Sequence, residues 1–483
     1  MLFNSFSYAF FLPFVFIIYW FVFNKNLRLQ NIFLLAVSYF FYGCWDWRFV
    51  FLLAFSTGLD YFSGIMIHES KTQKLRKFWL ILSVGINLGF LGFFKYYNFF
   101  IESFAELISN FGFQPHYATL NIILPVGISF YTFHGLSYVF DIYNRRIVPT
   151  RNIVDYTLFV SFFPLLVAGP IERATHLLPQ IEKPRVFDYN KAADGLRQIL
   201  WGLFKKMVIA DNCAVFANEI FNNSANQSGS NLVLGAVFFA FQIYGDFSGY
   251  SDIALGSARL LGIELLKNFN FPYFSRDIAE FWRRWHISLS SWFKDYLYIP
   301  LGGSKGGNWM RIRNTFIIFI VSGFWHGSNW TFIIWGALNA LFIVPSMLMR
   351  TNRNNMDIVA QNAVLPNFKE FLQMLVTFAL ACFAWIFFRA ESVGHAITYI
   401  EGIFSKGLFS IPNLLYNRKV IITICLLIFF VVVEWLGRRN NYAIEKLVFG
   451  NVRIVRWTFY AIIIFLIGMY MPSESAEFIY FQF

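Results

Sequence analysis

Long apolar runs separated by short basic loops recur along this sequence of 483 residues and constrain its fold. A helix needs about 20 predominantly apolar residues to cross the hydrocarbon layer of a bilayer. Together with two further segments that are candidates to cross, the runs predict an all-α integral membrane protein with about eleven transmembrane helices. The runs lie near 8–24, 30–44, 49–67, 78–97, 121–140, 231–260, 330–349, 371–388, 419–436 and 454–471, and the two further segments at 152–170 and 196–220.

The composition favours a membrane protein and argues against nucleic acid as a partner. Hydrophobic residues make up 57% of the chain and charged residues only 14%, whereas about a quarter of a soluble domain is charged. The net charge of +12 comes from short loops between apolar runs, which is typical of cytoplasmic loops rather than of a DNA-binding face. Four isolated cysteines show no metal-ligand spacing, so we expect packing roles and no bound metal or cofactor.

The basic loops also predict how the chain is oriented in the membrane. Lysine and arginine accumulate on the cytoplasmic side, and here they follow alternate apolar runs, beginning with Lys25 and Arg28. The intervening loops, such as 222–231, are nearly uncharged or acidic. We therefore expect both termini, including 472–483, outside the cytoplasm. The first run, 8–23, has no basic n-region or cleavage site, so it is expected to remain as a span.

Two segments, 164–206 and 276–313, mix apolar and charged residues and interrupt the spanning pattern. Irregular backbone at membrane depth is tolerated only where protein or water surrounds it. We therefore expect re-entrant and interfacial structure around a cavity that opens to the cytoplasm. No fixed repeat or Pro/Ser-rich linker divides the chain, so 1–483 is expected to form one membrane domain with its core at about 121–350.

The histidine with the strongest functional signal is His326, which follows Trp325 in an otherwise apolar run. Histidine at membrane depth is costly and usually faces a protein interior or a cavity, where it serves chemistry or transport. Thirteen residue steps separate it from the basic Arg313, a rise of roughly 20 Å along a helix. With turn residues at Gly327 and Asn329, we expect a hairpin from the cytoplasmic side with His326 at its tip. The alternative is a hydrogen-bonded core histidine.

The segment 281–296 has helical periodicity and predicts one amphipathic helix at the cytoplasmic interface. His286 falls at the edge of its aromatic face, where it can point into the protein. A functional His286 and a plain interfacial helix both fit this pattern. The aromatic face holds Trp282, Trp285, Leu289, Trp292, Phe293 and Tyr296, and the opposite face holds Arg284, Ser288, Ser291 and Asp295.

Polar residues interrupt the long apolar run 231–260, among them Tyr244, Asp246, Ser248 and Asp252. Two carboxylates at membrane depth must be paired, hydrogen-bonded or solvated. They either orient substrate hydroxyls or nearby histidines, or they form a polar patch that locks helices together. His134, another intramembrane histidine, is expected to be structural.

At these motifs the sequence resembles the membrane-bound O-acyltransferase family, and in particular its bacterial branch typified by the alginate O-acetyltransferase membrane subunit. The resemblance implies a ring of helices around a central tunnel, in a bacterial inner membrane. It implies His326 as the catalytic histidine and His286 as a second functional position. The strings that carry it lie at 1–5, 163–173, 244–252, 282–292, 298–303, 324–327 and 478–483.

The resemblance implies an enzyme that passes an acetyl group from a cytoplasmic thioester, acetyl-CoA or an acyl carrier protein, to an extracytoplasmic polysaccharide such as alginate. His326 would act as the general base, and His286 would orient the donor or stabilise developing charge. A periplasmic partner of the SGNH-hydrolase type is also implied. Further candidates for substrate or donor binding are Asp246, Tyr244, Ser248, Asp252, Trp325, Asn329, Arg284 and Lys305.

Lys305 belongs to a glycine-rich turn at 299–307. Such turns can hold phosphate through backbone N–H groups, but this one lacks P-loop spacing and follows no strand. We expect either a plain reversal of the chain, or a weak site where Lys305, Arg311 and Arg313 attract the phosphates of an acyl carrier.

Other functions stay open at this point. D-alanyl transfer to teichoic acid is the nearest alternative, and cellulose or peptidoglycan are alternative acceptors. A transporter that binds a proton or solute through its Asp and His residues belongs to a different class, as does a scaffold for polymer export. Inverted halves with paired broken helices would support a transporter, and none is apparent in the sequence.

The predicted orientation can be tested with single cysteines and an impermeant thiol reagent on intact spheroplasts. Ser228→Cys lies in an uncharged loop and should be labelled, whereas Ser304→Cys lies in a basic loop and should not. The unsubstituted chain gives the background from its own cysteines. Labelling at 304 but not at 228 would invert the topology.

Overall fold

The computed structural model describes residues 1–113, 119–167, 169–446, 452–471 and 478–479. Every regular element in these ranges is a helix, which confirms the predicted all-α fold. The chain divides into two compact units, residues 1–192 with 257–266, and residues 193–256 with 267–483. The expectation of one membrane domain stays a prediction, as does the expected position of residues 472–477 and 480–483, which lie outside the described residues.

Seven helices in the described ranges are long and apolar enough to cross a membrane. They agree with a multi-pass membrane protein, while the total of about eleven spans stays a prediction. A shorter apolar helix occupies Phe6–Val22. The seven are α3 (Arg48–Glu69), the continuous helix Gln73–Asn110, which contains α4 and α5, α12 (Gly229–Leu260), α16 (Trp330–Leu348), α17 (Phe368–Arg389), α19 (Arg418–Gly437) and α20 (Arg453–Tyr470).

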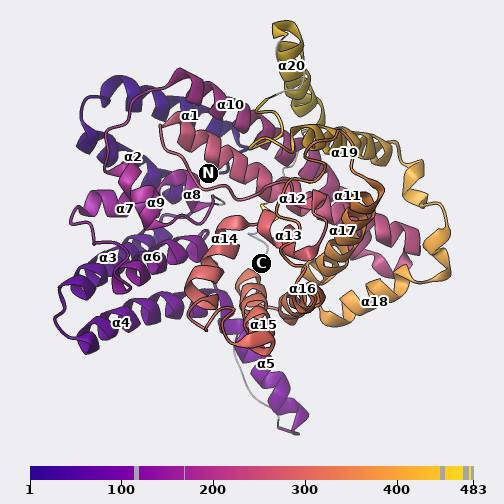
Figure 1. Ribbon diagram of the computed structural model, residues 1–483, viewed down its shortest axis with the longest axis horizontal. Coiled ribbons are helices and arrows are strands. Elements are labelled where there is room, and N and C mark those ends of the chain that lie inside the picture. Colours follow the sequence, from indigo (N-terminus) through magenta and orange to yellow (C-terminus); the bar gives the residue numbers. More distant parts are fainter. Residues whose placement is uncertain (114–118, 168, 447–451, 472–477, 480–483) are drawn as a thin grey trace. The chain divides into compact units, whose positions relative to one another are not determined.

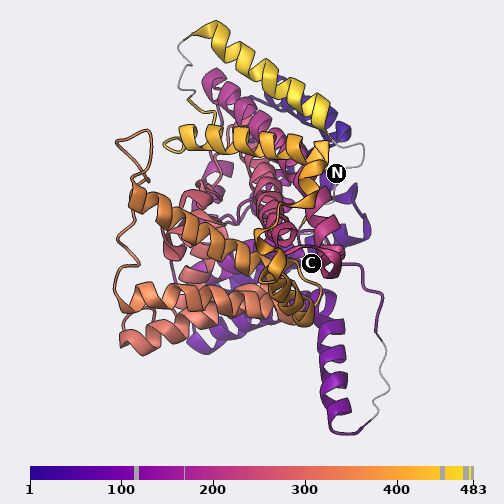
Figure 2. The same ribbon diagram turned by 90° about the vertical axis from the view of Figure 1, so that its right-hand side faces the viewer.

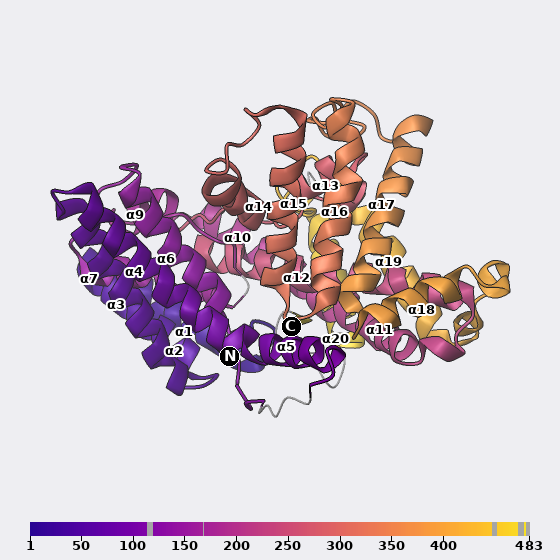
Figure 3. The same ribbon diagram turned by 90° about the horizontal axis from the view of Figure 1, so that it is seen from below.

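In the first unit, α3, α4 (Gln73–Leu91) and α6 (Ile128–Tyr143) lie side by side (Figures 1 and 3). Buried Asp60 on α3 accepts hydrogen bonds from Ser83 at 2.6 Å and Asn87 at 2.8 Å, both on α4. Because a buried carboxylate is costly unless hydrogen-bonded, this cluster fixes the packing of α3 against α4. His134 on α6 is fully buried in the same unit, which fits the structural role expected for it. The remaining helices are α1 (Phe6–Ile17), α2 (Leu27–Gly43), α5 (Tyr97–Asn110), α7 (Ile153–Ser161), α8 (Phe163–Leu166) and α9 (Ala174–Ile181).

The second unit contains the segments that the sequence analysis marked as functional. α10 (Tyr189–Phe204) runs into it from the first unit and continues as a π-helical segment, Lys205–Ala210. The other elements are α11 (Asp211–Asn222), most of α12, α13 (Ile278–Arg284), α14 (Ile287–Phe293), α15 (Gly307–His326), α16, α17, α18 (Val393–Ile403), α19 and α20.

The predicted hairpin is present as α15 and α16, which run side by side (Figures 2 and 3). α15 ends at His326, and the side chain of Asn329 caps α16 by accepting a hydrogen bond from the backbone N–H of Thr331. The two helices touch through their backbones at Gly323 and Gly336. A Cβ atom at Gly323 would lie 2.1 Å from the carbonyl oxygen of Phe332, and one at Gly336 would lie 2.2 Å from that of Phe319.

The single amphipathic helix predicted for 281–296 is wrong. α13 ends at Arg284 and α14 begins at Ile287, and His286 between them has a left-handed backbone with φ of 44°. The expected polar face also differs, because Arg284 is buried and its guanidinium bonds the Glu280 carboxylate at 2.8 Å. Helical periodicity carries no information about tertiary contacts, and here the backbone at Arg284 and Ile287 is hydrogen-bonded to residues 268–270 instead of continuing one helix.

The backbone contact in the hairpin predicts that Gly336→Ala destabilises the protein. A Cβ that close to a carbonyl oxygen forces the two helices apart, and overpacking of this kind costs about 1–3 kcal/mol. Its thermal unfolding midpoint in detergent should fall below that of the unsubstituted protein.

Gly89→Ala on α4 is the matched control, because nothing lies within 4 Å of a Cβ at that position. Alanine favours a helix over glycine by about 1 kcal/mol, so this variant should keep or raise the midpoint. An unchanged midpoint for Gly336→Ala would contradict the backbone contact.

Candidate active site

The two histidines singled out in the sequence lie next to each other in the second unit. The ring centroids of His286 and His326 are 6.3 Å apart, and the side chains are 1% and 4% exposed. Trp325 packs against both rings, at 4.8 Å from His326 and 6.0 Å from His286. Residues forty positions apart in sequence therefore form one buried site, with the tip of the hairpin on one side and the helix break on the other.

Aromatic rings form the walls of this site. His326 contacts Trp335 of α16 at 5.1 Å and Phe388 of α17 at 5.4 Å. His286 packs against Phe247 of α12 in a T-shaped contact, with the ring centroids 4.6 Å apart. Such walls exclude water, and in the resulting low dielectric a developing charge interacts more strongly with nearby dipoles than it does in water.

The helix break that presents His286 is held by the segment 268–270. The backbone N–H of Ile287 donates to the carbonyl of Asn268 at 2.9 Å, and the N–H of Asn270 donates to the carbonyl of Arg284 at 2.9 Å. A non-glycine residue in the left-handed region costs about 1–3 kcal/mol and persists only where its surroundings enforce it, often at functional sites. Burial lowers the pKa of His286, which lies outside the seven spanning helices, to about 3, so its ring is neutral.

The predicted carboxylates of α12 are paired with two buried lysines, as their depth requires. Asp246 lies 2.8 Å from Lys206, which also bonds Asp211 at 2.8 Å, and Asp252 lies 2.5 Å from Lys205. These pairs join α12 to the π-helical segment that begins at Lys205. Asp246 and Asp252 were expected either to orient substrate hydroxyls or nearby histidines, or to form a polar patch that locks helices together. The observed geometry matches the polar patch.

Other predicted binding residues also have protein partners. The hydroxyl of Tyr244 donates to Glu434 of α19 at 2.6 Å, and that of Ser248 donates to the backbone carbonyl of Tyr244. Asn329, besides capping α16, donates to the carbonyl of Glu391. Of the remaining candidates, Trp325 lies at the histidine pair, whereas Lys305 is exposed on its turn.

Several residues that shape the site were not predicted from the sequence, although charge at membrane depth was an available signal for some of them. Lys205, Lys206 and Glu434 are all buried in apolar surroundings. Asn268 carries no such signal, because an asparagine after a helix usually marks a turn. Among the residues that the structure describes, no group of three His, Cys, Asp or Glu side chains could hold a metal ion.

A basic cleft of about 690 Å³ lies between the break and the hairpin. Trp282 and Phe319 contribute to its apolar lining, and no acidic residue occurs among its described lining residues. Trp282 contacts Trp335 at 5.6 Å, and Trp335 contacts His326, so ring contacts connect the cleft to the histidine pair. Its basic residues are Arg283, Lys294, Arg311, Arg350 and Arg353. Of the three cations predicted to attract phosphate, only Arg311 lines it.

Comparison with known proteins identifies the family. Residues 143–388 match the family model described as MBOAT, membrane-bound O-acyltransferase family. The chain belongs to the membrane-bound O-acyltransferase family. The probable alginate O-acetylase AlgI of Pseudomonas aeruginosa is 38% identical over 86% of this chain and 78% of its own length. The peptidoglycan O-acetyltransferase of Helicobacter pylori is 36% identical over 83% of this chain and 80% of its own length.

A more distant relative is the teichoic acid D-alanyltransferase of Bacillus subtilis, 26% identical over 58% of this chain and 73% of its own length. Membership of the family makes this chain a multi-pass membrane O-acyltransferase and confirms the predicted fold class. The matched region contains both histidines and the basic cleft. The roles of the individual side chains stay predictions.

We predict that His326→Ala lowers acyl transfer by about 10²–10⁴ fold, because it removes the general base, while the protein still accumulates in the membrane. His286→Ala should retain more activity and should reduce chiefly the use of the cytoplasmic donor. Both are measured as acyl transfer by purified protein in proteoliposomes.

His68→Ala is the control for replacing a histidine, since His68 is exposed at the end of α3. Near-normal transfer by a well-accumulated His326→Ala protein would refute its catalytic role. If His286→Ala destroyed the fold and left donor use intact in the protein that remained, His286 would be a packing residue.

Proposed function

We propose that this protein transfers acetyl groups from a cytoplasmic thioester, across the membrane, to hydroxyl groups of an extracytoplasmic polysaccharide. The observation that carries the proposal is the buried histidine pair, with its 6.3 Å separation, connected by ring contacts to a basic cleft. The names of two relatives that align with more than four fifths of this chain support an acetyl group and a polysaccharide acceptor such as alginate or peptidoglycan.

In the proposed reaction, the neutral imidazole of His326 accepts the proton of the acceptor hydroxyl while that oxygen attacks the thioester carbonyl carbon. The negative charge on the carbonyl oxygen is stabilised by nearby donors, and a neutral His286 ring offers one N–H. The C–S bond then breaks, and the leaving thiolate takes the proton from His326. The products are an O-acetyl ester and a free thiol, and both histidines return to their starting state.

The basic cleft is the proposed entry of the donor, which is acetyl-CoA or an acyl carrier protein thioester. The five cations, in a described lining that contains no acidic residue, suit a phosphate-bearing carrier, and the apolar lining suits its uncharged arm. Arg353 and Lys294 are suited to direct contact with phosphate, whereas Arg283 already donates to the carbonyls of Asn352 and Asn355.

For the location, we propose the inner membrane of a bacterium, with both termini outside the cytoplasm. The alternation of basic and uncharged loops supports this orientation. A periplasmic partner of the SGNH-hydrolase type is part of the proposal and rests on the family resemblance. D-alanyl transfer to teichoic acid remains the alternative reaction, and two relatives with that name are 26% and 30% identical to this chain.

The test is transfer of labelled acetyl groups by purified protein in proteoliposomes, from acetyl-CoA or acetylated carrier protein outside to an oligosaccharide inside. We expect Lys294→Gln and Arg353→Gln each to raise KM for the donor about tenfold with kcat retained, since a hydrogen bond to a charged group contributes about 1.5 kcal/mol or more. D-alanyl carrier protein serves as the competing donor.

Lys369→Gln is the matched control, because Lys369 is exposed at the start of α17 and does not line the cleft. Its KM should stay unchanged. Transfer of D-alanine in preference to acetyl would replace the proposed substrate. An unchanged KM in both cleft variants would remove the cleft from the donor path.

A further inference from the structure

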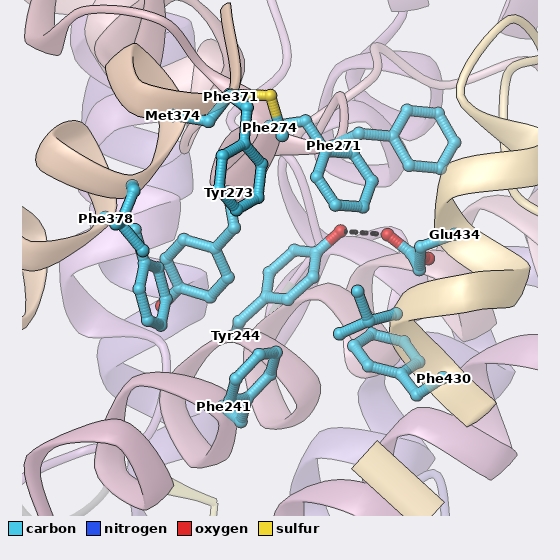
Figure 4. Close-up of a pocket in the computed structure, with 12 residues that line it drawn as sticks. Phe241, Tyr244, Phe271, Tyr273, Phe274, Phe371, Met374, Phe378, Phe430 and Glu434 are labelled. Carbon is cyan, nitrogen blue, oxygen red and sulfur yellow. Dashed lines mark hydrogen bonds between the residues drawn. The ribbon is translucent and has the colours of Figure 1, made fainter. Parts of the chain in front are cut away.

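A separate pocket of about 190 Å³ lies in the second unit and plays no part in the reaction proposed above. Its walls come from α12, α17, α19 and the short segment 271–274, and they are almost entirely aromatic or aliphatic (Figure 4). Phe241, Tyr273, Phe378 and Phe430 are among the rings that point into it.

The polar side chains that line the pocket, Tyr244, Tyr273 and Glu434, already have hydrogen-bond partners in the protein. Glu434 is the sole charged side chain among its described lining residues and is 3% exposed. Its two carboxylate oxygens accept hydrogen bonds from the Tyr244 hydroxyl at 2.6 Å and from the Trp201 indole N–H at 3.0 Å. Because these donors already satisfy the carboxylate, the pocket favours an apolar occupant.

The mouth of the pocket opens onto an apolar outer surface. Phe371 and Leu375 of α17 line the pocket and yet are 51% and 54% exposed. The residues next to the mouth on the outside of α17 and α19, such as Val376 and Val432, are exposed and apolar as well. Both helices are long and apolar enough to span the membrane. The mouth therefore opens onto the apolar outer surface of two helices of membrane-spanning length.

Water is a poor occupant of such a space. An apolar cavity of about 150 Å³ stays dry and accepts a small hydrocarbon, and this pocket is larger and similarly lined. Left empty, its lining would lose dispersion contacts on one side. We propose that the pocket binds the end of one acyl chain of a membrane phospholipid, inserted sideways between α17 and α19.

The bound chain would lie against the wall that supports the histidine pair. Tyr244 and Tyr273 line the pocket on one side and pack against Trp285 on the other, at 6.0 and 5.9 Å. Trp285 directly precedes His286. The inference is independent of the acyl group and of the acceptor, because it concerns only the fold of this unit and its contact with lipid.

The test uses full-length protein in proteoliposomes of phosphatidylethanolamine and phosphatidylglycerol, with a phosphatidylglycerol that carries a diazirine at the end of one acyl chain. After illumination, mass spectrometry locates the adducts. We expect adducts on Phe241 or Tyr244, which are buried or half-buried on α12. Val431→Trp fills the pocket from α19 and should lower these adducts about tenfold, because it occupies the space of the chain end.

Val432→Trp is the matched control, on the exposed face one residue further along α19. It should leave the adducts unchanged. Leu375→Trp at the mouth, with Val376→Trp as its control, repeats the comparison from α17 in case one substitution disturbs folding. Adducts on exposed Ile464 of α20 monitor general contact with lipid in every sample.

Absence of adducts at Phe241 and Tyr244 in the unsubstituted protein would overturn the proposal. Equal amounts of adduct on Phe241 and Tyr244 in the Val431→Trp and Val432→Trp variants would also overturn it. Labelling of Phe241 and Tyr244 by a water-soluble diazirine would do the same, because it would show that water enters the pocket. If the unsubstituted protein gave the expected adducts but did not transfer acetyl groups, the proposed reaction would be wrong and the lipid pocket would stand. The two proposals can therefore fail separately.

Discussion

The geometry of the active site depends on two backbone hydrogen bonds between the segment 268–270 and the break at Arg284–Ile287. They replace the bonds of a continuous helix and hold His286 in a left-handed backbone. In a continuous helix, the direction of the His286 ring would be set only by the position of that residue along the helix. The aromatic walls, the hairpin tip and the basic cleft are arranged around the position that these two bonds give to His286.

The sequence was sufficient for features that depend on local signals. The hairpin follows from an apolar run that stops at His326 and restarts after Asn329, and Asn329 does cap the next helix. The pairing of Asp246 and Asp252 follows from the cost of a lone charge at membrane depth, although their lysine partners were not foreseen. The two histidines could be chosen on chemistry and family resemblance, and the structure places them together.

Features that depend on distant contacts could not be predicted. Asn268, which receives the hydrogen bond at the break, lies eighteen residues before His286 and belongs to no recognisable motif. The burial of Arg284 depends on Glu280 and on a backbone carbonyl at Asp357, far along the chain. The helical periodicity of 281–296 is compatible with the two short helices α13 and α14. It carries no information about the contact that divides them.

The glycine contacts in the hairpin have a consequence for how this enzyme can change. Because α15 and α16 meet through backbone atoms at Gly323 and Gly336, the spacing of the two helices there is set by backbone contact rather than by the bulk of the surrounding side chains. The rings of Trp335 and Phe388 that pack against His326 can therefore be varied while the backbone of the hairpin stays in place. Substitutions in those rings can therefore reshape the surroundings of His326 without moving the two helices against each other.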